Sequence, residues 1–168
     1  MPPSATPSQP VTPNEDALYV HGTCVACGTR AVLLRGPSGA GKSDLAFRLI
    51  RADAAGETRL VADDQVHLVR KSERLVASAP AVLAGLIELR GLGLVAVPVA
   101  AQGDVALIVD LVPREDVPRL AEPRHEKIGG LSLPVLALHA FDATTPEKLR
   151  LALAAIPEKG FPGPDGRL

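Results

Sequence analysis

One stretch of eight residues constrains this chain more than any other: Gly36-Pro37-Ser38-Gly39-Ala40-Gly41-Lys42-Ser43. It matches the pattern G-x-x-x-x-G-K-[ST] of a phosphate-binding loop (Walker A motif) at every position. An apolar run at 31–34 leads into it and an amphipathic segment at 44–52 follows, which is the strand–loop–helix context the motif requires. The alternative is an ordinary glycine turn before a helix. The pattern and its context instead predict a loop that binds a nucleoside triphosphate.

The physical chemistry of such a loop assigns a task to each part. Glycines allow successive backbone N–H groups to turn toward one anion, and the following helix directs its positive end to the same place. Lys42 is expected to reach the β- and γ-phosphates of ATP, and the Ser43 hydroxyl to ligate Mg²⁺.

Length and charge narrow the class of protein. A chain of 168 residues is expected to form one domain with a sizeable core. The net charge is −1 and the chain has no basic block, so no nucleic-acid partner is expected. Apolar runs stay well short of the roughly 20 residues that span a bilayer, and no secretory signal is recognisable. We therefore expect a cytoplasmic protein without a membrane segment.

The composition divides the chain into three parts. Five prolines among Ser, Thr and Gln predict a disordered tail over 1–16. The globular domain is expected over 17–156. Glycine and proline predict a flexible tail over 157–168.

The pattern of apolar residues and turn signals predicts a strand-rich α/β domain. Extended segments are expected at 18–20, 24–27, 30–35, 60–62, 66–69, 75–77, 94–99, 104–111 and 131–138. Gly28-Thr29 would join two of them in a hairpin before the loop, and Pro134 would place the last strand at an edge or a bulge.

Helices are expected at 44–52, at 80–87, and from a Thr145 cap to 156. The first of them would be buried through Leu45, Ala46, Leu49 and Ile50. Segments 88–93 and 113–124 are expected to be loops. The sheet should be mixed, rich in hairpins and covered by few helices.

Cys24 and Cys27 form a C-x-x-C pair, with His21 three residues earlier. A redox pair or half of a zinc site is one interpretation. The pair lies in a predicted strand rather than at a helix N-terminus, and the sequence has no second cysteine pair. Structural cysteines are therefore the favoured interpretation.

Two segments compete to supply the magnesium-positioning acid that phosphoryl transfer needs at a strand end. The longer apolar run leads to Asp110, whereas a shorter one leads to the adjacent pair Asp63 and Asp64. Two neighbouring carboxylates repel each other unless a cation lies close by, which favours the pair. The alternative for the pair is a solvated turn.

Several motifs in one order give the chain a specific resemblance. His21-Gly22, the loop at 36–43, Leu60-Val-Ala-Asp-Asp-Gln-Val66, Ala79-Pro80 and Ile87-Glu-Leu-Arg-Gly-Leu-Gly93 occur together. This resembles the catalytic domain of the bacterial HPr kinase/phosphorylase family, most closely from about 21 to 97. The resemblance implies an HPr kinase/PEP carboxykinase-like fold and phosphorylation of a serine on the phosphocarrier protein HPr, a component of the phosphotransferase system. It also implies a homo-oligomer, in the family a hexamer.

The resemblance also implies roles for individual residues. Asp64 would accept the serine proton, Asp63 would help to hold the acids and the metal, and Glu88 would be a further Mg²⁺ ligand beside Ser43. His21 would line the site, although a strand histidine paired with backbone is an equal alternative. Arg90 would contact phosphate or tie its loop to Glu88. These residues do not distinguish ATP from pyrophosphate as the phosphoryl donor, and they do not identify a regulatory metabolite.

Two departures from the family pattern affect the expected activity. An N-terminal domain usually precedes the catalytic one, and here 16 residues do. An arginine-containing loop associated with the phosphorylase reaction is replaced by the short, arginine-free segment 99–103. Kinase activity is thus the firmer expectation, and the pattern resembles the compact alphaproteobacterial form of the family.

Two rival functions remain open. A small-molecule kinase would use a lid, for which Arg114, Arg119 and Arg124 are the candidates. A regulatory module would bind a nucleotide without transferring phosphate.

Overall fold

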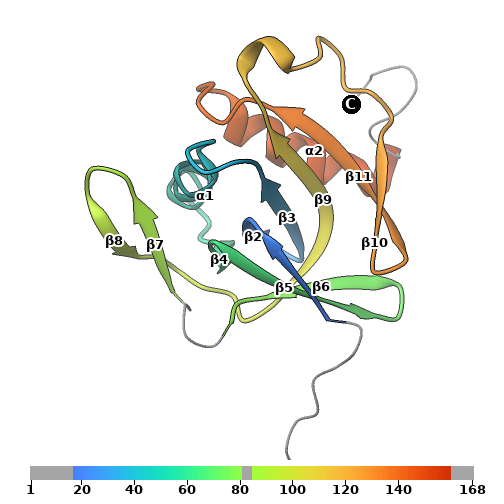
Figure 1. The fold of residues 1–168 in the computed structure, drawn as a ribbon, viewed down its shortest axis with the longest axis horizontal. Coiled ribbons are helices and arrows are strands. Elements are labelled where there is room, and N and C mark those ends of the chain that lie inside the picture. The colour runs from blue at the N-terminus through green and yellow to red at the C-terminus, as the bar shows by residue number, and fades with distance from the viewer. Residues whose placement is uncertain (1–16, 81–84, 160–168) are drawn as a thin grey trace, which may run out of the picture.

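The computed structural model describes residues 17–80 and 85–159 of the chain (Figure 1). The expected tail at 1–16 and most of the tail at 157–168 lie outside the described residues. The strands are β1 (Leu18–His21), β2 (Thr23–Cys27), β3 (Arg30–Arg35), β4 (Thr58–Ala62), β5 (Gln65–Lys71), β6 (Arg74–Ser78), β7 (Leu86–Leu89), β8 (Gly93–Ala96), β9 (Gly103–Leu111), β10 (His125–Ile128) and β11 (Leu131–Leu138). The helices are α1 (Lys42–Arg51), α2 (Thr145–Lys159) and the short 3-10 helix η1 (Arg114–Asp116).

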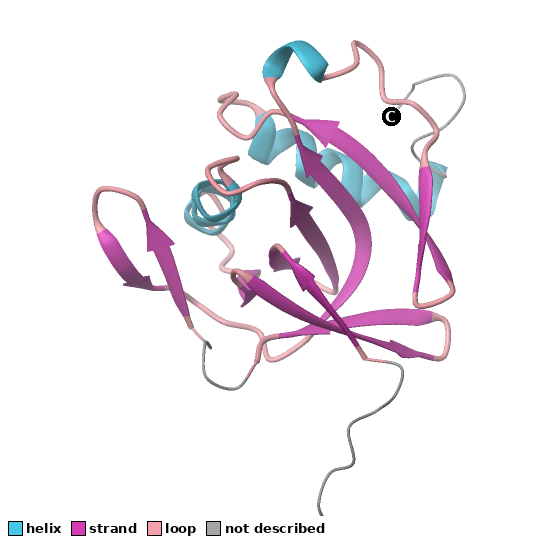
Figure 2. Cartoon of the chain, viewed as in Figure 1, coloured by secondary structure: helices cyan, strands magenta, loops and turns pink. Residues whose placement is uncertain are grey.

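Nine of these strands form one mixed sheet. Its path runs β1-β5-β6-β9-β3-β2-β4, and β11 joins it by pairing with β9 and with β10. Strands β3, β9 and β11 run parallel to one another, whereas the other pairs are antiparallel. Strands β7 and β8 form a separate hairpin. Strands dominate the described part of the chain (Figure 2), so the expected α/β class with a mixed, hairpin-rich sheet and few helices is confirmed.

The sheet buries both of its faces, because alternate side chains of β3 enter two different cores. Val32 and Leu34 pack with the apolar faces of α1 and α2 in one core. Ala31 and Leu33 pack in the second core, which includes side chains of β5 and β6. The long strand β9 contributes to both cores and bends between them, as Figure 1 shows. The loop strand β3 is therefore held from both sides.

The region around the loop forms as the sequence predicts. Strands β2 and β3 pair from Cys27↔Arg30 onward, leaving Gly28-Thr29 as a two-residue turn. The φ of Gly28 is 63°, which a turn of this kind requires and glycine adopts without strain. Helix α1 buries the four expected residues, Leu45, Ala46, Leu49 and Ile50. The second hairpin, β5–β6, also forms, with slightly longer strands than predicted.

The segment between β6 and β9 differs from the prediction. Residues 81–84 of the expected helix lie outside the described residues, and its last two residues, Leu86 and Ile87, belong to strand β7. The expected loop at 88–93 instead comprises the last two residues of β7, a hairpin turn at 90–92 and the first residue of β8, and β8 ends at Ala96 rather than at Val99. Ile87 is fully buried beside α1, so packing against the helix stabilises an extended conformation here.

The C-terminal part shows three further differences. Strand β10 was not predicted, since its sequence HEKI has a weak apolar pattern. Pro134 pairs with His125 of β10, before the point at which β11 joins β9, which explains how a strand proline is tolerated. Thr145 is the first residue of α2 and donates its hydroxyl to the His139 carbonyl at 2.7 Å, rather than capping the helix. Helix α2 continues to Lys159, past the boundary expected at 156.

Candidate active site

The predicted loop lies at the edge of the sheet where several strands end. Because β3, β9 and β11 are parallel, their carboxyl ends meet at one edge. Strand β4 runs in the same direction, being antiparallel to β2, which is antiparallel to β3. The loop at 36–43, the acids after β4 and the loop before α2 therefore come together (Figure 1). The carboxyl edge is where ligands bind in open α/β sheets.

Glycines in the loop are required by its geometry. Gly41 precedes α1 with a φ of 91°, and a Cβ on it would lie 2.7 Å from the Ala140 Cβ and 2.8 Å from Cζ of Phe141. Gly36 has a φ of 150°, and a Cβ there would lie 3.0 Å from the Leu111 carbonyl oxygen. The loop is thus packed against the ends of β9 and β11 at positions where only glycine fits.

Lys42 is folded back along the loop. Its Nζ donates hydrogen bonds to the carbonyl oxygens of Gly36 at 2.7 Å and Pro37 at 3.0 Å, and the residue is buried. These contacts hold the ammonium group over the loop that was predicted to bind phosphate.

Asp63 joins the loop helix to two strands. Ser43 Oγ donates to its carboxylate, at 3.0 Å from Oδ1 and 3.1 Å from Oδ2. Thr23 Oγ1, on the fully buried first residue of β2, donates to Oδ1 at 2.7 Å. Mg²⁺ is bound through oxygen atoms, so the chemistry of the Ser43 hydroxyl and the Asp63 carboxylate fits this ion. Thr23 was not predicted as a site residue. The only indication in the sequence is its position directly after His21-Gly22.

Asp64 faces His21 rather than the loop helix. Its Oδ1 lies 3.3 Å from His21 Nδ1, and both side chains are exposed, by 72% and 56%. The backbone of Asp64 has a φ of 68°, and its carbonyl accepts a hydrogen bond from the Gly22 N–H at 3.0 Å. A Cβ on Gly22 would lie 2.7 Å from the Leu34 carbonyl oxygen. Gly22 therefore lets the chain pass β3 closely and places His21 next to Asp64.

Asp110, the rival acid, is engaged elsewhere. It lies within β9, one residue before the end of this strand, and pairs with Arg35 at 2.8 Å and Arg124 at 3.1 Å. Arg35 also donates both ends of its guanidinium to Glu126, each at 2.8 Å. These bonds raise the pKa of Arg35 and lower the pKa of Glu126. Asp110 thus belongs to an ion-pair cluster that ties β3 to β9 and β10, whereas Asp63 contacts the loop helix.

Glu88 lies on the β7–β8 hairpin, which stands beside α1 and outside the main sheet (Figure 1). It is exposed, between buried Ile87 and half-buried Leu89. In the described part of the chain Glu88 makes no hydrogen bond or ion pair with Ser43 or Asp63, and no three His, Cys, Asp or Glu side chains are grouped to hold a metal. Arg90 is exposed in the turn of the same hairpin.

The lid expected of a small-molecule kinase is not supported by the arginines proposed for it. Arg114 pairs with Asp142 at 3.3 Å, and Arg124 pairs with Asp110 as described. Two of the three candidates thus anchor the 112–124 connection to the body of the domain.

The short segment before β9 is also anchored. Leu60 of β4 donates its N–H to the Pro98 carbonyl at 2.8 Å and accepts from the Ala100 N–H at 2.9 Å. The segment therefore runs along β4 as a short connection.

The cysteines lie in β2 and their side chains enter different cores. Cys24 is fully buried in the core shared with β5 and β6, whereas half-buried Cys27 packs toward α2. Both thiols are free, and burial raises the pKa of each. These properties fit the structural role expected from the sequence.

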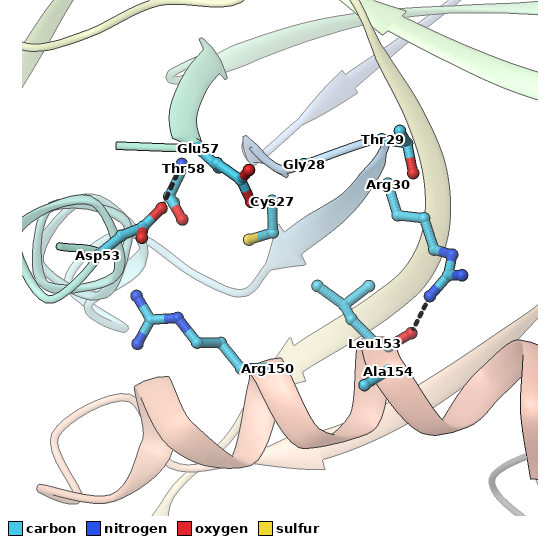
Figure 3. A pocket seen from close by; sticks show the side chains of 10 residues that line it. All are labelled: Cys27, Gly28, Thr29, Arg30, Asp53, Glu57, Thr58, Arg150, Leu153 and Ala154. Carbon is cyan, nitrogen blue, oxygen red and sulfur yellow. Dashed lines mark hydrogen bonds between the residues drawn. The ribbon is translucent and has the colours of Figure 1, made fainter. Parts of the chain in front are cut away.

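A pocket of about 520 Å³ lies at the opposite edge of the sheet (Figure 3). It opens between the β2–β3 turn, the start of β4 and helix α2. Arg30 at the start of β3 donates to the Leu153 carbonyl, and Arg150 donates to the Leu49 carbonyl, each at 2.6 Å. Hydrogen bonds from Thr58 lower the pKa of Asp53 on its wall. The pocket is thus separated from the loop by the length of β3.

Comparison with known proteins identifies the family to which this fold belongs. The family model described as HPr Serine kinase C-terminal domain matches residues 15–137. An HPr kinase/phosphorylase of Geobacillus kaustophilus is 37% identical over 131 residues, covering 71% of this chain and 41% of the relative. One from Levilactobacillus brevis is 38% identical over 100 residues, covering 55% and 31%. The solved Hpr(Ser) kinase/phosphatase of Coxiella burnetii superposes with a TM-score of 0.73 at 27% identity, covering 85% of this chain and 92% of that one.

The fold and the loop–acid arrangement therefore define a domain of the HPr kinase class. The chain belongs to the HPr serine kinase C-terminal domain family. It spans less than half the length of the curated relatives described above. No helix among the described residues is long and apolar enough to cross a membrane.

Proposed function

We propose that this chain is an ATP-dependent protein kinase that phosphorylates a serine of an HPr-type phosphocarrier protein. The observation that carries the proposal is the Ser43–Asp63 contact, which joins the loop helix to the acid pair at one edge of the sheet. Exposed Asp64 stands next to that contact in the chain, so a substrate hydroxyl can approach it from solvent. The names of the relatives supply the substrate.

In this proposal the loop at 36–43 holds the phosphates of ATP, and Lys42 moves from the loop carbonyls to the β- and γ-phosphates. The serine oxygen of HPr attacks the γ-phosphorus, the bond from that phosphorus to the bridging oxygen breaks, and ADP leaves. Asp64 accepts the serine proton as the new P–O bond forms. His21 lies against Asp64 and orients its carboxylate.

Ser43 and Asp63 are the proposed ligands of Mg²⁺, which offsets the charge of the transferring group when it is bound. Glu88 is proposed as a further ligand, reaching the metal from the β7–β8 hairpin beside α1. Thr23 fixes the orientation of Asp63 through its buried hydroxyl.

The test is incubation of the purified chain with ATP, Mg²⁺ and HPr, followed by mass spectrometry of HPr. We expect one added phosphoryl group on a serine. Nucleotide binding without phosphoserine would overturn the kinase proposal and favour a regulatory module. Phosphorylation of a sugar or nucleoside, with none on HPr, would favour a small-molecule kinase.

The reverse reaction is examined with phosphoserine-HPr and inorganic phosphate. The same carboxylate would return the proton to the serine oxygen by microscopic reversibility. Because the segment 99–103 carries no arginine and is too short to fold over a phosphate, we expect the forward reaction to dominate.

We also propose that the catalytic unit extends over 17–156, acts in the cytoplasm and assembles as a homo-oligomer, a hexamer by family resemblance. Light scattering of the purified chain measures the assembly directly, and a monomeric mass would overturn that part.

A further inference from the structure

We propose that Phe141 is the surface on which the nucleobase of the donor stacks, so that the site selects a nucleotide over a polyphosphate that lacks a base. The inference rests on the proposed function and names its donor. The ring lies in the connection between β11 and α2, at the same edge as the loop.

Phe141 contacts the end of the loop directly. A Cβ on Gly41 would lie 2.8 Å from Cζ and 3.1 Å from Cε1 of the ring, so the side chain occupies the space that this glycine leaves open. The residue is nevertheless 57% exposed. It therefore presents an uncovered aromatic surface immediately beside the start of α1, the place that the motif assigns to phosphate.

The other aromatic side chains are placed differently. The chain has three Phe and one Tyr, and Phe161 lies outside the described residues. Phe47 is partly buried against the core on α1. Tyr19 stacks on His67, with ring centroids 4.8 Å apart, on the edge strand β1. In the described part of the chain, the exposed aromatic ring in contact with the loop is therefore Phe141.

The ring is held by its neighbours. His139 packs edge-on against it with centroids 5.7 Å apart, and His139 Nδ1 lies 3.0 Å from the Val112 carbonyl oxygen. The Arg48 guanidinium, on α1, donates to the carbonyl of Ala140 just before Phe141.

The residue after Phe141 is anchored as well. The Asp142 carboxylate pairs with Arg114 at 3.3 Å and with Lys148 at 3.7 Å. A surface fixed in advance loses little freedom when a ligand binds, so the exposed ring is suited to stacking.

Stacking on an aromatic ring tolerates any base, because every base has a π face. The proposal therefore predicts that ATP and GTP bind with similar affinity, and that both bind more tightly than inorganic tripolyphosphate. The phosphates and Mg²⁺ interact with the loop in all three cases, so the difference measures the nucleoside, and the effect of removing the Phe141 ring measures the base.

The test compares the wild-type chain with Phe141→Ala and with a matched control, Leu151→Ala, whose side chain is 58% exposed on α2. Calorimetry with Mg²⁺ gives affinities for ATP and for tripolyphosphate. We expect Phe141→Ala to weaken ATP binding about tenfold and to leave tripolyphosphate binding unchanged, while Leu151→Ala changes neither.

A second variant tests the same contact by fluorescence instead of affinity. The chain contains no Trp, so Phe141→Trp introduces a single tryptophan, which can be excited selectively over Tyr19. Its emission should be quenched by ATP and not by tripolyphosphate, whereas Leu151→Trp should respond to neither.

Equal ATP affinity in Phe141→Ala and the wild type would overturn the inference and leave the kinase proposal standing. The same conclusion would follow if the fluorescence of the Phe141→Trp variant did not distinguish ATP from tripolyphosphate. A wild-type chain that binds neither compound would overturn both proposals.

Discussion

Ser43 donates a hydrogen bond to Asp63, 3.0 Å from Oδ1, so the first turn of α1 and the acid after β4 are joined directly. Asp110 has the longer apolar strand before it and yet pairs with Arg35 and Arg124. Contact with the loop helix, rather than the length of the preceding apolar run, therefore distinguishes Asp63 from Asp110, the two candidates that the sequence left open.

Replacing each acid should separate their roles. Asp63→Asn should lower phosphoryl transfer and weaken Mg²⁺ binding by about 10- to 100-fold, because it removes a charged oxygen from the ion. Asp110→Asn should retain transfer and lower the free energy of unfolding by about 1–2 kcal/mol, since it weakens the pairs with two arginines. Metal titration of the activity and urea unfolding measure the two effects. The reverse pattern would identify Asp110 as the metal-positioning acid.

Asp64→Asn should retain ATP binding and lower the rate of transfer to HPr by about 10²- to 10⁴-fold, because it removes the proton acceptor and keeps the shape of the side chain. Single-turnover transfer at saturating ATP is the measurement. Asp104→Asn is the matched control, an acid at the start of β9 paired with Arg74. A wild-type rate in Asp64→Asn would show that another group accepts the proton.

Thr23→Val should leave the half-buried Asp63 carboxylate without the shortest of its hydrogen bonds, and Thr23→Ser should retain it. We expect the valine variant to require about tenfold more Mg²⁺ for half-maximal activity, with a smaller change in the maximal rate. The serine variant should resemble the wild type. If both variants shift the unfolding midpoint equally and leave the Mg²⁺ requirement unchanged, Thr23 acts only in packing.

The Arg35–Glu126 pair should make stability depend on pH at the acid side. The pair lowers the pKa of Glu126 below its usual value of 4.5 in the folded chain. The folded state therefore binds this proton less readily than the unfolded state. The contribution is complete above the usual pKa and is lost as pH falls through the lowered one.

Glu126→Gln removes this contribution. Its deficit in the free energy of unfolding, relative to the wild type, should be largest near neutral pH and should shrink as the solution becomes acidic enough to protonate Glu126 in the folded chain. Urea unfolding at a series of pH values measures it. A deficit that stays constant with pH would mean that the bond to Arg35 does not depend on the charge of Glu126.

Local signals in the sequence predicted the elements nearest the loop. Strand β3 is bounded by Arg30 and Arg35 as expected, and Gly28-Thr29 forms the expected turn, because turn chemistry and apolar alternation act within a few residues. The acid pair after β4 was also predicted as a candidate site. The different roles of Asp63 and Asp64 were implied only by the family resemblance, and their separate contacts to Ser43 and His21 could not be read from local signals because they depend on the strand order.

Long-range packing decided the elements that were predicted wrongly. Ile87 was placed in a helix and lies in β7, where contact with α1 favours an extended chain. The Thr23–Asp63 bond joins residues 40 positions apart, so no local pattern reveals it. Phe141 was likewise not recognised as a neighbour of the loop, since the two segments meet only through the parallel pairing of β11, β9 and β3.

The left-handed backbone conformation of Asp64 limits which amino acids can replace it in related proteins. Its φ of 68° is tolerated by Asp, Asn and Gly and is costly for other residues. A relative that has lost transfer but kept the fold is therefore expected to carry Asn or Gly here, in preference to Ala or Glu. In an alignment of such proteins, the residue at this one position would separate active enzymes from domains that have become binding proteins.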